Sequence, residues 1–352
     1  MANQKGGCGK TTAAVNLAGA LAALDRRVLL LDNDPQGHAT LACGLRDRDF
    51  TLSTYDLYLT TDILVEDAMV EVGPRLHLVP AGIELSAVEP QLAGVDQREV
   101  RLRDTLRRSA LPYDYVLIDC PPSVGLLTFN ALLASGEVLV PGDASPYSVQ
   151  AAHKLHETFA VLQERRGHVV VARVLRSDFD TRPRFAQALV ADLTAQYGDR
   201  LLATIVHHTV RVPEAAAAGR PVLEHDPQSR ASHDFRQLAR EITAFESDLA
   251  APALDHWAAL LHGPEVTPAG VRFVGDFPQA SSVEVTGTFN GWAPRGARLT
   301  RCRDGFWESV VPLAEGTYEY RFIVDGHWVP DPHNTQVVNN EFGGANSLVA
   351  VP

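Results

Sequence analysis

A glycine-rich run near the start of the chain combines two lysines with two adjacent threonines, in the order Lys5-Gly6-Gly7-Cys8-Gly9-Lys10-Thr11-Thr12. Glycines at this spacing let the backbone turn its N–H groups toward phosphate oxygens, and a helix that follows adds its positive N-terminal end. Lys10 is placed to reach the β- and γ-phosphates of a nucleotide, and the Thr11 hydroxyl is placed to ligate Mg²⁺. The run therefore predicts a binding site for ATP and Mg²⁺.

The choice of basic residues supports this prediction. The chain holds three lysines, Lys5, Lys10 and Lys154, against 28 arginines, and two of the three lysines fall in the glycine-rich run. Lysine offers a compact ammonium group that the planar guanidinium of arginine cannot imitate at a crowded phosphate. We therefore favour a phosphate loop over the alternative, a glycine-rich turn in which the lysines are incidental.

Two later segments end an apolar run with acidic residues. They read Leu29-Leu30-Leu31-Asp32-Asn33-Asp34-Pro35-Gln36-Gly37-His38-Ala39-Thr40 and Tyr113-Asp114-Tyr115-Val116-Leu117-Ile118-Asp119-Cys120-Pro121-Pro122. The general phosphate-loop pattern has a glycine where this chain has Gln4, and that departure comes together with Lys5. With these three segments in this order, the first 245 residues or so resemble the ParA/MinD family of partition ATPases.

The resemblance implies a role for several residues. Lys5 would reach across an ATP-dependent homodimer to the partner's phosphates, and Asp34 would orient the attacking water. Asp119 would hold Mg²⁺ through water, together with Thr11. The family also implies an ATPase-activating partner protein. In the later part of the match, His207-His208-Thr209-Val210-Arg211 departs from the usual Pro-Arg-Asn, which weakens any transfer of adenine or DNA contacts from that loop.

The C-terminal part carries a second set of motifs. These are Val285-Thr286-Gly287-Thr288-Phe289-Asn290-Gly291-Trp292, the run from Gly316 to Pro332, and Asn339-Asn340-Glu341-Phe342-Gly343-Gly344-Ala345-Asn346-Ser347. They closely resemble the glycogen-binding module of AMP-activated kinase beta subunits, carbohydrate-binding module family 48.

The resemblance implies that two tryptophans, Trp292 and Trp328, stack on sugar rings. Arg321 stands where the kinase module has a lysine, Phe342 would support the sugar, and Asn346 would hydrogen-bond its hydroxyls. The alternative is that both tryptophans are core residues of a sandwich that binds no sugar. We expect Trp307, which lies inside a strand, to be a core residue.

The elements that must position these residues fall into two blocks. Residues 1–262 alternate short apolar runs with helical stretches, which predicts an α/β domain with the parallel sheet of a P-loop NTPase. The first strand of this sheet is expected to be truncated, because only Met1 to Gln4 precede Lys5. Residues 263–270 are expected to form a linker. Residues 271–352 predict an all-β, immunoglobulin-like sandwich. The expected strands of the first block are 27–31, 76–80, 115–118, 138–141, 169–175 and 201–206.

Composition narrows the class of protein. With 45% hydrophobic and 21% charged residues, the chain resembles an ordinary globular protein, and no apolar run approaches the ~20 residues that span a bilayer. Its four cysteines are scattered, as expected in a reducing cytoplasm.

The net charge of −12 does not indicate nucleic-acid binding, which would need a local basic face. The candidate DNA contacts are Arg200, Arg211, Arg220, Arg230, Arg236 and Arg240.

These observations favour a Mg²⁺-ATP-dependent dimerising ATPase of the partition class, whose β-module binds an α-glucan such as glycogen and recruits the protein to polysaccharide. The protein is expected in the cytoplasm, in association with the nucleoid or with glycogen granules. One alternative is a chromosome or plasmid partition ATPase that binds DNA without sequence preference, with the β-module as a protein-interaction domain. Another is a non-catalytic scaffold, which follows if the truncation of the first strand is real.

Overall fold

A computed structural model gives the fold as two compact units, Met1–Glu246 and Ser247–Pro352, and each is described by itself. The structure describes residues 1–109, 111–143, 155, 158–159, 171–179, 193–194, 197–248, 263–267, 269–275, 277, 279–301, 307–334, 336–340 and 344–351.

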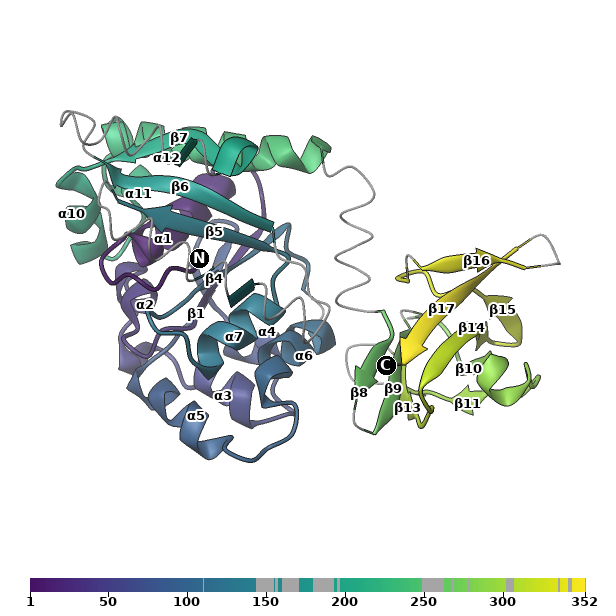
Figure 1. Cartoon of the computed structure of the whole chain (residues 1–352). Helices are drawn as coiled ribbons and strands as arrows, with labels where there is room; N and C mark the ends of the chain where they lie inside the picture. The colour runs from purple at the N-terminus through teal and green to yellow at the C-terminus, as the bar shows by residue number, and fades with distance from the viewer. Residues whose placement is uncertain are drawn as a thin grey trace. The chain divides into compact units, whose positions relative to one another are not determined.

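The first unit is built on parallel strands (Figure 1). In one group, β1 lies between β3 and β4 and is parallel to both, while β2 adds an antiparallel edge. In the other group, β5, β6 and β7 run parallel in that order. The strands are β1 (Val28–Asp32), β2 (Val70–Gly73), β3 (Leu76–Val79), β4 (Tyr115–Asp119), β5 (Glu137–Gly142), β6 (Val171–Phe179) and β7 (Leu201–His207). Except for β2, all were expected from the sequence, and the prediction of a parallel α/β sheet is confirmed.

The two groups of strands meet at the first residues of the chain. Cys120, which follows β4, donates its backbone N–H to the carbonyl of Met1 (3.2 Å), and Ala2 donates to the carbonyl of Leu139 in β5 (3.1 Å). In the described residues, the central strand expected before the glycine-rich run is thus represented by this short bridge. The first half of β4 has no described partner on that side, and Val116 is 37% exposed.

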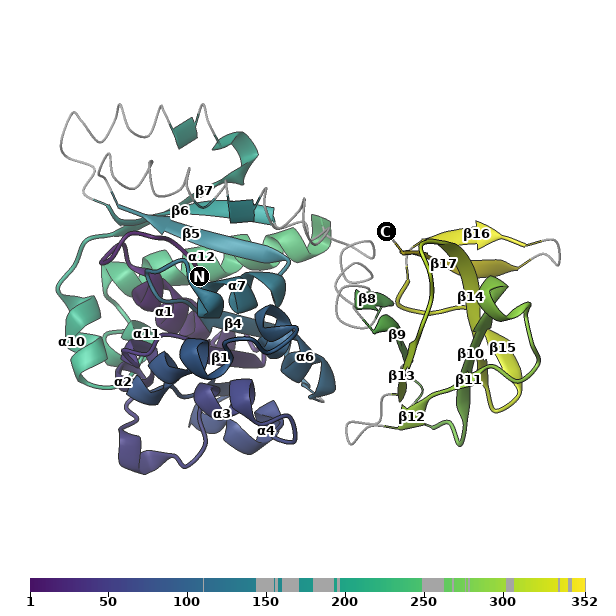
Figure 2. The same ribbon diagram turned by 60° about the horizontal axis from the view of Figure 1, so that its bottom comes forward.

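Helices cover both faces of the sheet, as parallel strands require. Alternate residues of β1 enter different cores: Val28 and Leu30 pack with α1 and α12, whereas Leu29 and Leu31 pack with α3, α6 and α7. Figure 2 shows α12 running along the strands β5, β6 and β7. The helices are α1 (Lys10–Ala22), α2 (His38–Ala42), α3 (Thr54–Leu59), α4 (Val65–Ala68), α5 (Val88–Gln91), α6 (Arg101–Arg108), α7 (Leu126–Leu133), α10 (Arg211–Ala217), α11 (Val222–His225) and α12 (Arg230–Asp248), with short 3₁₀ turns at Asp47–Asp49, Ile83–Ala87, Arg98–Val100 and Gly198–Arg200.

The second unit consists of two antiparallel sheets that share one core. The described strands of one sheet follow the order β11-β10-β14-β17-β16, with β15 paired to β14, and those of the other follow β12-β13-β9-β8. Val271, Phe273, Val285, Tyr320 and Phe322 lie in the core between them. The strands are β8 (Glu265–Thr267), β9 (Gly270–Gly275), β10 (Val283–Gly287), β11 (Ala297–Arg298), β12 (Thr300–Arg301), β13 (Trp307–Val311), β14 (Gly316–Val324), β15 (His327–Val329), β16 (Val337–Asn339) and β17 (Ala345–Val351). This agrees with the sandwich expected from the sequence.

The segment 263–270, expected to be a linker, instead contributes to the second unit. Glu265 of β8 lies opposite Arg272 of β9, with the carboxylate and guanidinium 3.8 Å apart. The Thr267 hydroxyl donates to the carbonyl of Gly270 (2.8 Å) and closes the turn between the strands. Residues 265–267 and Gly270 of this segment therefore belong to two antiparallel strands.

Candidate functional sites

The glycine-rich run forms a tight loop that leads directly into α1. Gly7 (φ 72°) and Gly9 (φ 89°) adopt the left-handed backbone conformation that glycine tolerates best. A Cβ atom at Gly9 would lie 2.5 Å from the Ser177 hydroxyl of β6, so the close approach also requires glycine. Gly6 and Gly7 are exposed, and Thr11 lies in the first turn of α1. The loop therefore presents its backbone at the N-terminal end of a 13-residue helix, as a phosphate site requires.

Both lysines of the loop are held by the chain itself. Lys10 is 7% exposed, and its ammonium donates to the carbonyl of Lys5 (3.1 Å). The Lys5 ammonium forms an ion pair with Asp143, which follows β5. The Cys8 thiol donates to the same Lys5 carbonyl (3.1 Å), and burial raises its pKa, which indicates a structural thiol. Sequence reasoning did not find Asp143, because 138 residues separate it from Lys5.

Two of the aspartates meet where neighbouring strands end. Asp32 of β1 lies directly opposite Asp119 of β4. Asp32 accepts hydrogen bonds from the backbone N–H and the hydroxyl of Thr40 (both 2.8 Å) and from the N–H of Asp34 (3.1 Å). Asp34, which is 7% exposed, accepts from the N–H of Gln36 (3.0 Å). Asp32 thus holds the loop that carries Asp34, a positioning role that the sequence analysis had not assigned.

Asp119 is a completely buried carboxylate. Neither of its oxygens accepts a hydrogen bond of ordinary geometry from the residues that the structure describes. Burial raises its pKa, the charge of Asp32 raises it further, and the nearby Thr11 hydroxyl lowers it. Burial likewise raises the pKa of Asp32 to about 6, against its hydrogen bonds from Thr40. A bound cation would stabilise the charged form of such a buried carboxylate.

The donor set suits Mg²⁺. In the described part of the chain, no group of three or more His, Cys, Asp or Glu side chains has the geometry of an all-protein metal site. Mg²⁺ is commonly held through one or two carboxylates, a hydroxyl, water and substrate phosphates, which is what Asp119 and Thr11 offer beside the phosphate loop. The residues therefore fit the ion that the sequence predicted.

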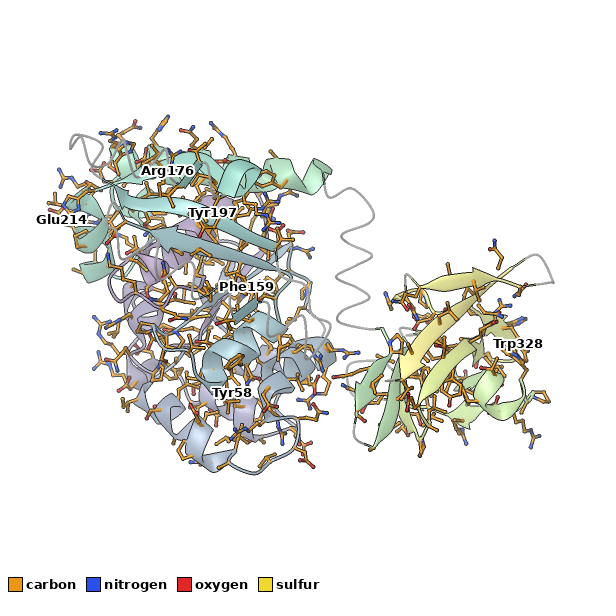
Figure 3. The ribbon with its side chains drawn as sticks, in the orientation of Figure 1. Tyr58, Phe159, Arg176, Tyr197, Glu214 and Trp328 are labelled. Atoms are coloured by element: carbon orange, nitrogen blue, oxygen red, sulfur yellow. The ribbon has the colours of Figure 1, made fainter. Side chains whose placement is uncertain are left out.

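Trp292 and Trp328 lie side by side in the second unit. Their ring centroids are 6.1 Å apart, and the rings are tilted by 36°. Trp328 is 39% exposed and Trp292 is half-buried, and neither belongs to the core between the sheets. Figure 3 shows Trp328 at the surface of the second unit. By contrast, Trp307 is 6% exposed and donates its indole N–H to the carbonyl of Phe277 (3.0 Å), so its expected core position is confirmed.

The turn that presents Trp292 is strained. Trp292 has a φ of 58°, a conformation that bulky residues seldom adopt, and it follows the 3₁₀ turn Thr288–Asn290. The Asn290 carboxamide oxygen accepts from the Thr286 hydroxyl (2.9 Å) and the Gly287 N–H (3.0 Å), which fixes the turn. A strained backbone held by its surroundings points to a function for the side chain that it displays.

Two polar residues were expected to bind sugar together with the tryptophans, Arg321 on β14 and Asn346 on β17. Arg321 donates to the carbonyl of Trp328 (3.0 Å). Asn346, expected to bind sugar hydroxyls, is 6% exposed: its amide donates to Glu319 (2.8 Å), and its oxygen accepts from Asn340 (2.9 Å). A direct sugar contact by Asn346 would require these bonds to open. Phe342 lies outside the described residues.

Glu319 was missed by the sequence analysis. It stands two positions before Arg321 on the same strand, so both side chains point to the same face of the sheet. One of its carboxylate oxygens accepts a hydrogen bond from the Asn346 amide (2.8 Å). The alternation along β14 was the signal that could have identified it.

Two of the six arginines considered for DNA contacts share one face of a helix. Arg230 and Arg240 are exposed on α12, and their spacing places them on the same face as His233. Arg211 instead pairs with Glu214 (2.8 Å). The remaining three are Arg200 and Arg220, both exposed, and Arg236, which donates to a backbone carbonyl.

No helix of the described residues has the length and apolarity to cross a bilayer.

Comparisons with known proteins match each of the two units to a different family. Residues 1–171 match a family model described as an AAA domain, and residues 276–352 match the glycogen recognition site of AMP-activated protein kinase. The chain is 35% identical over 243 residues to the sporulation initiation inhibitor protein Soj of Bacillus subtilis (strain 168), a match that covers 69% of this chain and 96% of Soj. It is 37% identical over 244 residues to the chromosome partitioning protein ParA of Myxococcus xanthus (strain DK1622), covering 69% of this chain and 86% of ParA.

A solved structure shows the fold with nucleotide and metal. The crystal structure of cobyrinic acid a,c-diamide synthase from Mycobacterium smegmatis, with bound ATP analogue and magnesium, matches with a TM-score of 0.60 and 28% identity. The match covers 70% of this chain and 93% of the synthase. The α/β unit described above is thus similar to one that holds an ATP analogue with magnesium.

Proposed function

The chain belongs to the ParA/Soj family of partition ATPases and carries a module of the AMP-activated kinase glycogen-recognition type, and on this premise we propose that it is a Mg²⁺-ATP-dependent dimerisation switch whose second unit binds an α-glucan. The fusion of the two units, rather than either unit alone, carries the proposal. Homology supports ATPase chemistry in the first unit. The adjacent tryptophans Trp292 and Trp328, of which Trp328 is exposed, support sugar binding in the second.

Nucleotide would bind on the loop before α1. Backbone N–H groups of the loop from Gly6 to Gly9 would receive the phosphates, and Lys10 would leave the Lys5 carbonyl to compensate the β/γ-phosphate charge. Thr11 and, through water, Asp119 would hold Mg²⁺, which neutralises charge on the β- and γ-phosphates. The cost of burying the Asp119 carboxylate, visible in its raised pKa, would then be offset.

Hydrolysis needs a positioned water rather than covalent help. Asp34 is the carboxylate that we assign to this water, since its loop is fixed by Asp32 and its own side chain is almost fully buried beside the site. ATP would close the dimer through Lys5, and hydrolysis would open it. Closure would require the Lys5–Asp143 ion pair to break.

The glucan would lie across the tryptophan pair. Sugar rings present C–H faces that stack on aromatic rings, and their hydroxyls require charged or amide partners. Trp292 and Trp328 offer the stacking surface, while Arg321 and Glu319 lie on the adjacent strand. We propose that this surface takes an α-glucan such as glycogen, as cargo or as a signal, in the cytoplasm.

A DNA-binding partition ATPase is the second candidate. The observation that favours it is the exposed face of α12 with Arg230, His233 and Arg240. If this face binds duplex DNA, affinity should fall with salt by roughly 0.9 log units per phosphate contact for each log unit of salt. Absence of binding at low salt with Mg²⁺-ATP present would exclude this candidate.

Two lysine variants test the switch. Lys10→Ala should abolish ATP binding in isothermal calorimetry, because the phosphate charge loses its partner in the loop. Lys5→Ala should bind ATP with the affinity of the unaltered chain but should fail to form the ATP dimer in sedimentation velocity. Unchanged ATP affinity in Lys10→Ala would contradict the assignment of the loop.

A further inference from the structure

A buried amide lies between the two aspartates of the first site. Asn33 follows β1, separates Asp32 from Asp34 and is completely buried. Its backbone N–H donates to the carbonyl of Asp119 at the end of β4 (2.9 Å). The residue is thus attached by its main chain to both strands whose ends carry the carboxylates.

The Asn33 side chain joins two helices. Its amide nitrogen donates to the carbonyl of Leu127, in the first turn of α7 (2.9 Å), and its oxygen accepts from the Tyr58 hydroxyl of α3 (2.9 Å). Tyr58 is 1% exposed and lies among the helices on one face of the sheet (Figure 3). Both side-chain bonds are therefore shielded from water, where a hydrogen bond is strong and its loss leaves a buried polar group unpaired.

Leu127 brings a second loop into the same cluster. The loop 120–125 connects Asp119 to α7. The Thr128 hydroxyl donates to the carbonyl of Ser123 (2.6 Å), so this loop is fixed to the first turn of α7. Through Leu127, Asn33 connects the Asp34 loop to the loop after Asp119.

A wholly apolar side chain could fill this buried position without placing an amide in the core. The amide nitrogen and the oxygen of Asn33 instead form hydrogen bonds with α7 and α3. A fully satisfied buried polar cluster favours a single arrangement of the parts that it joins. That arrangement includes the position of Asp34, one residue away.

We propose that Asn33 is a positioning residue for ATP hydrolysis: its bonds to Leu127 and Tyr58 hold the Asp34 loop and the loop after Asp119 in one geometry. Asn33 acts through Asp34 and does not touch the nucleotide. The inference rests on the ATP hydrolysis proposed for this site. It assigns Tyr58, which lies in α3 rather than in the nucleotide loops, to the same hydrolysis machinery.

The test compares turnover with nucleotide affinity. Asn33→Ala removes both side-chain bonds and should lower kcat at least about tenfold, because a small displacement of a positioned group costs much of its effect. The dissociation constant for Mg²⁺-ATP should stay within about twofold, because the phosphate cradle is intact. Tyr58→Phe keeps the ring and loses one bond, so its loss of kcat should be smaller, about threefold.

Thr105→Val is the matched control. Thr105 is buried in the same core, and its hydroxyl donates to the carbonyl of Leu57 in α3 (3.2 Å). This variant should lose stability without changing kcat, measured well below its melting temperature. The double variant Asn33→Ala/Tyr58→Phe should have the kcat of Asn33→Ala, since both substitutions break the same bond.

Several outcomes would overturn the proposal. Normal kcat in Asn33→Ala with a lowered melting temperature would show that the cluster only stabilises the fold. If Asn33→Ala does not fold, normal kcat in Tyr58→Phe would have the same meaning. Loss of ATP affinity equal to the loss of kcat would place Asn33 in binding. Absence of ATP hydrolysis by the unaltered chain would overturn both this role and the proposed function. This outcome differs from a failure of the Asn33 role alone, in which the unaltered chain hydrolyses ATP and Asn33→Ala does so equally fast.

Discussion

Removing the Asp143 carboxylate should make ATP-dependent dimerisation easier. Lys5 is assigned to the phosphates of the partner, yet in the single chain its ammonium pairs with Asp143, and the two side chains are 23% and 22% exposed. Each subunit would have to break this pair before Lys5 can cross. Asp143→Asn removes the charge with almost no change in shape.

The expected change in the free energy of dimer formation follows from the burial of the Lys5–Asp143 pair. Exposed ion pairs contribute about 0.2–1 kcal/mol, and a pair that is about four-fifths buried belongs at the upper end, about 1 kcal/mol. Two pairs break for each dimer, so the variant should gain about 2 kcal/mol in dimer formation. This corresponds to a dimer dissociation constant lower by roughly thirtyfold.

Sedimentation velocity over a range of protein concentrations gives this constant directly. The measurement uses saturating Mg²⁺-ATP and an Asp34→Ala background, so that ATP is not consumed. Asp114→Asn, which weakens the Arg27–Asp114 pair (3.6 Å) elsewhere in the unit, should leave the constant unchanged. An unchanged or weaker dimer in Asp143→Asn would refute the reasoning, because Asp143 would then not compete for Lys5.

The remaining predictions concern hydrolysis and sugar binding. Asp34→Ala should bind Mg²⁺-ATP and persist as a dimer in gel filtration, and hydrolysis at the unaltered rate would remove Asp34 from the mechanism. Trp328→Ala should lose glycogen in co-sedimentation with little change in melting temperature, whereas the buried Trp307→Ala should cost about 3–5 kcal/mol of stability. Glu319→Gln should weaken binding of malto-oligosaccharides in calorimetry, since a charged acceptor makes a stronger hydrogen bond than a neutral one, and equal affinity would exclude Glu319 from the site.

The sequence predicted the features that depend on neighbouring residues, namely the phosphate loop and most strands of the first unit. The phosphate loop was identified because Gly7, Gly9 and Lys10 are required by type at fixed spacing. The strands that end at Asp32 and Asp119 were identified because their apolar runs and acids follow that loop in the order of a known family. Edge strand β2 escaped detection, since it is short and partly exposed. Residues 263–270, which include β8, were interpreted as a linker, because their Pro and Gly residues resemble those of a connection.

Long-range pairing was the part that the sequence could not supply. Asp143 and Lys5 meet only because the loop before α1 lies against the end of β5. Asn346 was assigned to sugar hydroxyls, but its amide is engaged by Glu319 and Asn340, and that triangle exists only once β14 and β17 have paired. Each of these contacts depends on the register of distant strands, which local patterns do not encode.

Co-sedimentation of the full chain with glycogen, in Mg²⁺-ATP and in Mg²⁺-ADP, tests the central claim most directly. A dimer carries two sugar-binding units, and bivalent attachment raises apparent affinity by up to about 10²–10⁴-fold where both sites engage. The account predicts that glycogen pulls down the chain in both states, at least about tenfold more strongly with ATP, and that Trp328→Ala stays in the supernatant. Recovery of the unaltered chain from the supernatant in both nucleotide states would contradict it.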